Sequence, residues 1–135
     1  MKTTYEKLFI FANTAQRWLA SGKGRTETKL GYALKRMDSQ VKALHEKHQA
    51  ALQDINIDCC AVDAAGVILN DEYGRLRFTK DGLRERNKKQ EELSQSEIEI
   101  EPCFATQTPD DLSDAEREAF AGFVLKVDEA AAAVS

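Results

Sequence analysis

The sequence has few of the residues on which disulfide-linked or membrane-spanning proteins depend. Only three cysteines and two prolines occur among 135 residues, and Cys59 and Cys60 are adjacent, which is a poor geometry for a disulfide bridge. No unbroken apolar run, such as Leu8 to Ala12, is longer than five residues, which predicts neither a signal peptide nor a transmembrane helix. We therefore expect a cytoplasmic protein, either in a host cytosol or in a virion, with no membrane association.

Signals for catalysis or for a bound cofactor are equally scarce. His45, His48, Cys59 and Cys60 offer imidazole and thiolate groups, which are zinc ligands. On a continuous helix, however, His48 and Cys59 lie about eleven residues and roughly 16 Å apart, too far for one tetrahedral site. The three glutamates from Glu97 to Glu101 have no nucleophile or base beside them at a recognisable spacing. We predict no metal site, no cofactor and no enzymatic activity.

A single long helix from Thr26 to about Asp58 organises the rest of the chain. Its apolar positions recur in two interleaved seven-residue series, which is the pattern of a coiled-coil seam. The first series is Leu30, Met37, Leu44 and Ala51, and the second is Leu34, Val41, His48 and Ile55. A helix of this length requires partners along its seam, supplied by other helices of the same chain or by a second copy.

Shorter elements are expected on both sides of this helix. A first helix, started by a capping box at Thr3 and Glu6 and stopped at Ser21 and Gly22, should fold back on the long one. The remaining expectations are a β-hairpin from Val67 to Thr79, an exposed helix from about Gly82 to Ser94, a strand from Glu97 to Glu101, and a helix from Ser113 to Val127.

The predicted fold is therefore α+β and predominantly α. It contains an antiparallel helical hairpin with one long helix, a small β-hairpin plus a third short strand, and a C-terminal helix. We expect one domain over residues 1–129 and a frayed tail over residues 130–135.

Charge is distributed in blocks of opposite sign. Residues 75–89 carry seven basic and two acidic groups, whereas residues 90–118 carry one basic and ten acidic groups. The basic run can bind a partner or be neutralised by the acidic block. Six of its seven cations form our candidate interaction surface, together with three residues that widen or interrupt the apolar stripes. These nine residues are Phe11, Trp18, His48, Arg75, Arg77, Arg84, Arg86, Lys88 and Lys89.

The order of these signals resembles a family of short phage and prophage proteins of uncharacterised function. The matching residues are the Gly22-Lys23-Gly24-Arg25 link with Lys29, Asp63 with Gly66 before the hairpin, Glu92-Leu93 leading to Ile98-Glu99-Ile100, and the ending from Leu112 to Val127. The resemblance implies a phage-related context. It implies no activity, because the family provides no catalytic residues to compare.

These observations favour a non-enzymatic protein of phage or prophage type that binds other proteins, as a virion component or an assembly factor, with self-association as one form of that binding. The first alternative is an anti-defence or regulatory inhibitor that binds nucleic acid through residues 75–89 or mimics it with residues 90–118. The second alternative is a small enzyme without a recognisable motif. Nucleic acid is the less favoured partner, because the basic run has no stacking aromatic residues interleaved with it.

Overall fold

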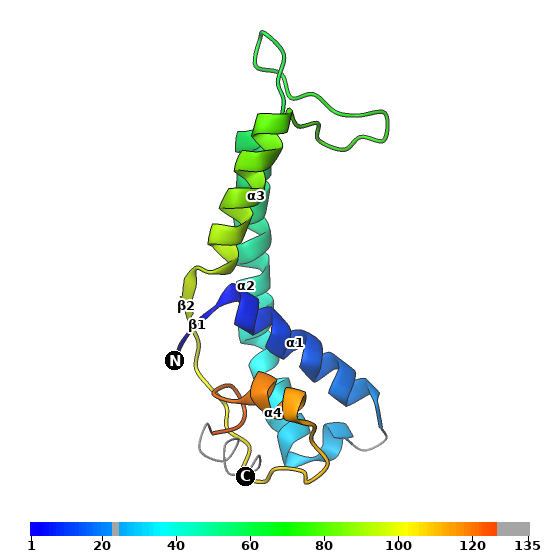
Figure 1. Ribbon diagram of the computed structural model, residues 1–135. Coiled ribbons are helices and arrows are strands. Elements are labelled where there is room, and N and C mark those ends of the chain that lie inside the picture. The colour runs from blue at the N-terminus through cyan, green and yellow to red at the C-terminus, as the bar shows by residue number, and fades with distance from the viewer. Residues whose placement is uncertain (23–24, 127–135) are drawn as a thin grey trace. The chain divides into compact units, whose positions relative to one another are not determined.

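The computed structural model describes residues 1–22 and 25–126 and is shown in Figure 1. Within these residues the chain forms four α-helices and one two-stranded antiparallel sheet, which confirms the α+β, mainly α class. The elements are β1 (Lys2–Thr4), α1 (Tyr5–Ala20), a short 3-10 helix η1 (Arg25–Glu27), α2 (Lys29–Cys59), α3 (Lys80–Ser94), β2 (Glu97–Glu99) and α4 (Asp114–Phe120).

Some of the sequence predictions fall outside the described residues. They are Lys23 and Gly24 of the link after α1, Val127 at the end of the predicted last helix, and the tail over residues 130–135.

The chain divides into two compact units. Unit 1 comprises Met1–Ala43 and the chain from Glu97 onward, and unit 2 comprises Leu44–Ser96. The long helix α2 contributes its first half to unit 1 and its second half to unit 2. All eight residues of its two predicted apolar series are buried or half-buried, so the seam faces inward as its spacing predicts.

Unit 1 has a dense aromatic core. The ring of Phe11 in α1 stacks on Phe123 with centroids 4.4 Å apart, and Phe120 of α4 meets both Phe11 and Trp18 edge to face. Such pairs bury large apolar areas in a preferred ring geometry. Leu8, Leu30, Met37, Ile100, Val124 and Leu125 complete the core.

The sheet of unit 1 joins the start of the chain to β2. Lys2 pairs with Glu99 and Thr4 with Glu97, in antiparallel register. The predicted third strand therefore exists, but it pairs with β1, a strand that the sequence analysis did not foresee. The region from Val67 to Thr79 forms a turn closed by one bridge, between Asn70 and Leu76, rather than two strands of a sheet.

Side-chain caps mark the starts of α1, α3 and α4. Ser113 and Glu116 form the predicted capping box of α4. At α1 the cap is Thr4, the last residue of β1, whose hydroxyl accepts from the Lys7 N–H. The prediction of Thr3 was therefore wrong by one residue, and Thr3 is instead buried within β1 opposite Ile98. Helix α4 ends at Phe120 rather than near Val127, because the chain turns sharply at Gly122, where φ is +82°.

In unit 2, α3 runs antiparallel to the second half of α2 (Figure 1). The two helices come close together at Gly82, where an added Cβ would lie 2.6 Å from the Cys59 carbonyl oxygen. The Arg86 guanidinium also donates to the Asn56 side chain at 2.9 Å. No residue of α3 is buried, which confirms the predicted exposure of this helix, and the buried side chains of the unit are only His48 and Cys60.

Candidate interaction surface

Three members of the predicted surface lie in the interior. Phe11 and Trp18 are each 1 % exposed and form the core of unit 1, and His48 is buried in unit 2. These three residues could bind a partner only if they were exposed, so we remove them from the candidate interaction surface. Phe11 and Trp18 widen the apolar stripe of α1 because that helix packs against the C-terminal segment with Phe120 and Phe123, which the sequence pattern alone does not reveal.

Burial also changes the titration of His48. Loss of solvation lowers the pKa of its imidazole below the ordinary value near 6.5, and repulsion from His45 lowers it further. The side chain therefore favours the neutral form, as a buried histidine in an apolar series should.

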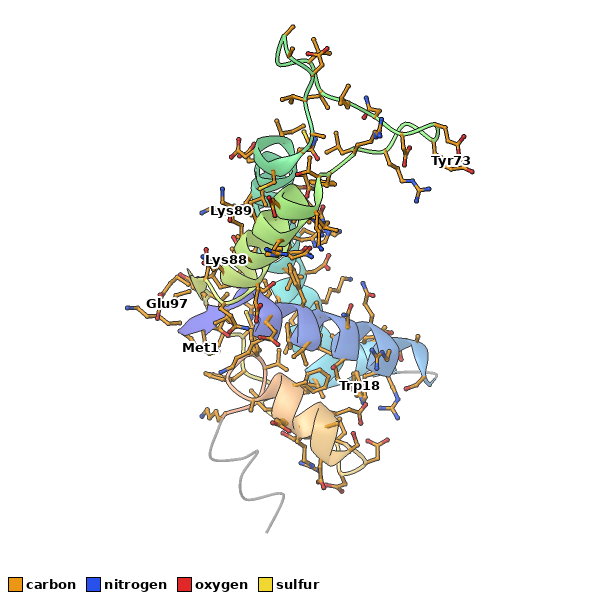
Figure 2. All side chains as sticks on the ribbon, turned by 45° about the horizontal axis from the view of Figure 1, so that its top comes forward. Met1, Trp18, Tyr73, Lys88, Lys89 and Glu97 are labelled. Atoms are coloured by element: carbon orange, nitrogen blue, oxygen red, sulfur yellow. The ribbon has the colours of Figure 1, made fainter. Side chains whose placement is uncertain are left out.

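The basic residues of the predicted surface are exposed or half-buried, and the ion pairs that they form are local. Arg75 pairs with Asp71 at 3.6 Å, Arg84 with Asp81 at 3.9 Å, and Lys89 with Glu85 at 4.0 Å. Arg86 is held by Asn56 and Asn87, whereas Arg77 and Lys88 make no side-chain hydrogen bond or ion pair with any residue in the described part of the chain. Figure 2 shows Lys88 and Lys89 on α3.

The segment from Ala61 to Phe78, which we call the two-turn module, contains an internal repeat that the sequence analysis missed. Asp63 and Asp71 each begin an Asp-x-x-Gly turn, and the two turns are offset by eight residues. In the first turn the Asp63 carboxylate accepts from the N–H groups of residues 65 and 67, and the Asp71 carboxylate accepts from those of residues 73 and 75. Gly66 and Gly74 take positive φ at the same place in each turn.

A closed ring of three backbone hydrogen bonds ties the two turns together. Ala61 N–H donates to Arg77 C=O at 2.7 Å, Arg77 N–H to Leu69 C=O at 3.1 Å, and Leu69 N–H to Ala61 C=O at 3.0 Å. These residues are eight apart, like the aspartates. The ring provides a hydrogen-bond partner for the N–H and the C=O group of each of the three residues and holds the bases of both loops together. The module is therefore an ordered element, although it contains no regular β-strand.

The two-turn module carries most of the exposed large apolar side chains of unit 2. Tyr73 is 73 % exposed and Val67 59 % exposed, and the exposed set also includes Val62, Ile68 and the adjacent Ile57. Figure 2 shows Tyr73 at the outer end of its loop, where the Arg75 guanidinium lies 5.2 Å from the ring centroid. Exposed apolar clusters of this kind are typical of protein-binding surfaces.

Within the parts of the chain that the structure describes, no three His, Cys, Asp or Glu side chains are close enough to hold a metal ion. Among the same residues, no helix is both long enough and apolar enough to cross a bilayer. Comparisons with protein-family models, with curated proteins and with solved structures find no match to this chain.

Proposed function

We propose that this chain is a non-enzymatic protein-interaction protein whose main docking element is the two-turn module. The observation that carries the proposal is the exposure of Val67, Ile68 and Tyr73 on loops whose backbone is fixed by the ring of hydrogen bonds. Side chains presented by an ordered backbone lose less conformational entropy on binding than side chains on a floppy loop.

The partner we propose is another protein of the same phage-related context, as for a virion component or an assembly factor. This context rests on the resemblance of the sequence signals to short phage proteins. The mixed character of the module supports a protein partner, because an exposed tyrosine beside Arg75 combines the two residue types that are enriched at the centres of protein interfaces.

The test compares a module variant with a variant that loses an exposed apolar side chain elsewhere. Val67→Ser, Ile68→Ser and Tyr73→Ser are combined in one chain. The control is Ile10→Ser, which removes an exposed aliphatic side chain from α1 in unit 1. Both variants change only exposed side chains, so circular dichroism and thermal melting should match those of the original chain.

Each tagged chain is used to capture proteins from a phage-producing host, and its mass in solution is measured by light scattering. We expect the original chain and the Ile10→Ser variant to retain the same partner, or the same self-association, and the module variant to lose it. Capture of one set of proteins by all three chains, or a monomer that captures nothing in any case, would refute the proposal.

A further inference from the structure

A second surface, independent of the two-turn module, lies entirely within unit 1. It is an open groove of about 790 Å³ between one stripe of α2 and the extended segment from Pro102 to Thr106. We call it the α2 groove, and the side chains used below are Glu27, Lys29, Tyr32, Arg36 and Phe104.

The stripe of α2 is set by helical spacing. Lys29, Tyr32 and Arg36 lie three and four residues apart, so they share one face of the helix. The facing segment runs antiparallel to this helix: Gln40 exchanges two hydrogen bonds with the backbone of Glu101, at 2.8 and 2.9 Å, and residues 107–110 line a hollow with Glu27 and Lys29. The groove therefore has two fixed and roughly parallel walls.

One edge of the extended segment has no hydrogen-bond partner in the described part of the chain. The N–H groups of Cys103 and Ala105 donate to carbonyls of the turn at Phe123 and Val124, at 3.0 and 2.8 Å. Alternate residues of an extended chain direct their backbone groups to opposite sides, so those of Phe104 point away from this turn. In residues 1–22 and 25–126, the N–H and C=O of Phe104 have no hydrogen-bond partner, and no residue of the turn lines the α2 groove.

The charges of the groove are also uncompensated. Lys29 and Arg36 are exposed and form no ion pair with any residue that the structure describes. Glu27 stands at one end of the groove, next to Lys29. With two cations and one carboxylate, the lining has a net positive charge and a negative end at Glu27. Tyr32 and Phe104, both exposed, form the apolar part between the cations.

We propose that the α2 groove binds an extended acidic peptide segment of a partner protein. The peptide adds as a strand to the free edge at Phe104, and its carboxylates pair with Lys29 and Arg36. These two cations are separated by about 10 Å along the helix. Carboxylates four residues apart in an extended peptide lie on the same face and about 13 Å apart, a span that the long Lys29 and Arg36 side chains can match. Strand addition provides affinity through the main chain, and the flanking charges provide specificity.

A peptide is favoured over a single-stranded nucleic acid, although both have groups that bind cations and aromatic rings. The free N–H and C=O of Phe104 match the alternating groups of a peptide backbone, and the carboxylate of Glu27 would repel a continuous phosphate chain. An interrupted acidic sequence can avoid Glu27, whereas a phosphodiester backbone cannot.

The test uses a fluorescein-labelled peptide of alternating valine and threonine that contains two glutamates four residues apart, so that both carboxylates lie on one face of the extended chain. Its binding to the full chain is followed by fluorescence anisotropy at low salt. We expect Arg36→Glu to weaken binding by at least about tenfold. Lys35→Glu is the matched control, because it makes the same charge change at an adjacent exposed residue of α2 that does not line this groove, and it should have little effect.

Two altered peptides separate the backbone contribution from the charge contribution. Replacing both glutamates by lysine should abolish binding, and N-methylation of the central backbone amides should weaken it while the charges are kept. Equal losses for Arg36→Glu and Lys35→Glu, or no effect of N-methylation, would overturn the proposal.

Three further results would also overturn it. The first is the absence of binding at millimolar peptide concentration. The second is Arg36-dependent binding of a labelled single-stranded oligonucleotide in place of the peptide. The third is Arg36-dependent dimerisation by light scattering without peptide binding, which would make the groove an interface between two copies of this chain. Failure here would leave the module test unaffected, because the two surfaces share no residue.

Discussion

Units 1 and 2 are stabilised in different ways. Unit 1 buries Phe11, Trp18 and Phe120 almost completely and ties its strands and helices together through contacts between distant parts of the chain. Unit 2 is a pair of helices with a two-turn module, and its largest apolar side chains remain half-buried or exposed. Backbone hydrogen bonds and helix contacts therefore account for more of the order in unit 2, and apolar burial accounts for more of it in unit 1.

This contrast relates stability to binding. Apolar area that a unit does not bury on folding is available to a partner, and a region with few buried contacts also opens at a lower free energy. The exposed side chains of the two-turn module and the small interior of unit 2 are related, since several of the aliphatic residues of this unit, among them Val62, Val67 and Ile68, lie exposed on its loops.

Loss of a core aromatic ring should show the contrast most strongly. Phe120→Ala removes a fully buried ring that contacts both Phe11 and Trp18, and we expect it to lower the free energy of unfolding by about 3–5 kcal/mol. Phe78→Ala makes the same chemical change at a half-buried position of unit 2, where we expect about 1–2 kcal/mol. Urea unfolding followed by circular dichroism measures both. Equal losses would show that the two units do not differ in the way described.

Two close glycine contacts test how firmly each unit holds its backbone. At Gly31 an added Cβ would collide with the Arg25 carbonyl and the Thr26 Cα, and Arg25 is itself held by Asp111 at 2.9 Å. We expect Gly31→Ala to cost about 2 kcal/mol, because these backbone atoms cannot move freely.

The counterpart in unit 2 is Gly82→Ala, whose Cβ would meet the Cys59 carbonyl oxygen at 2.6 Å. Alanine favours the helical state of α3, and the sparsely packed helix pair can separate slightly. We therefore expect a net cost below about 1 kcal/mol. Thermal melting of both variants gives the comparison. A larger loss for Gly82→Ala would indicate that the contact between α2 and α3 is the more rigid one.

The sequence predicted those features that depend on neighbouring residues. The capping box at Ser113 needs only Glu116 three residues later, and the long apolar series of α2 is visible as a periodic pattern. The pairing of β1 with β2 joins Lys2 to Glu99. No pattern among neighbouring residues indicates a contact between positions so far apart in the sequence. The same limitation hid the reason for the wide stripe of α1, whose partner Phe123 lies near the other end of the chain.

The two candidate surfaces differ in the same way, since one depends on neighbouring residues and the other on contacts between distant ones. The repeat of Asp-x-x-Gly in the two-turn module was available in the sequence and could have been found by a search for short internal repeats. The free edge at Phe104 could not have been found in this way. It exists because Cys103 and Ala105 use the opposite edge to bond the turn at Phe123, which is a property of the tertiary structure.

Helix caps provide a smaller comparison between the units. Ser113 caps α4 in unit 1 and Thr79 caps α3 in unit 2, each by accepting a backbone N–H. Ser113→Ala should lower the free energy of unfolding by about 1 kcal/mol, since α4 carries the buried Phe120.

Thr79→Ala should instead act mainly within unit 2. We expect faster amide hydrogen exchange in the first turns of α3 and little change in the exchange of unit 1. Mass spectrometry of exchanged peptides distinguishes these outcomes. An equal acceleration throughout both units would mean that they open together.

The smallest expected effect concerns acid. The pKa of His48 is lowered by burial, so between its folded pKa and the ordinary value near 6.5 the unfolded chain binds more protons than the folded chain. Stability should therefore fall as the pH drops from about 7.5 to about 5.5, a range in which most carboxylates stay ionised. His48→Gln should flatten this slope in thermal melts, whereas His45→Gln should leave most of it, because His45 contributes only the second cause of the shift. An unchanged slope in His48→Gln would show that the neutral imidazole in unit 2 is not the group that links folding to pH.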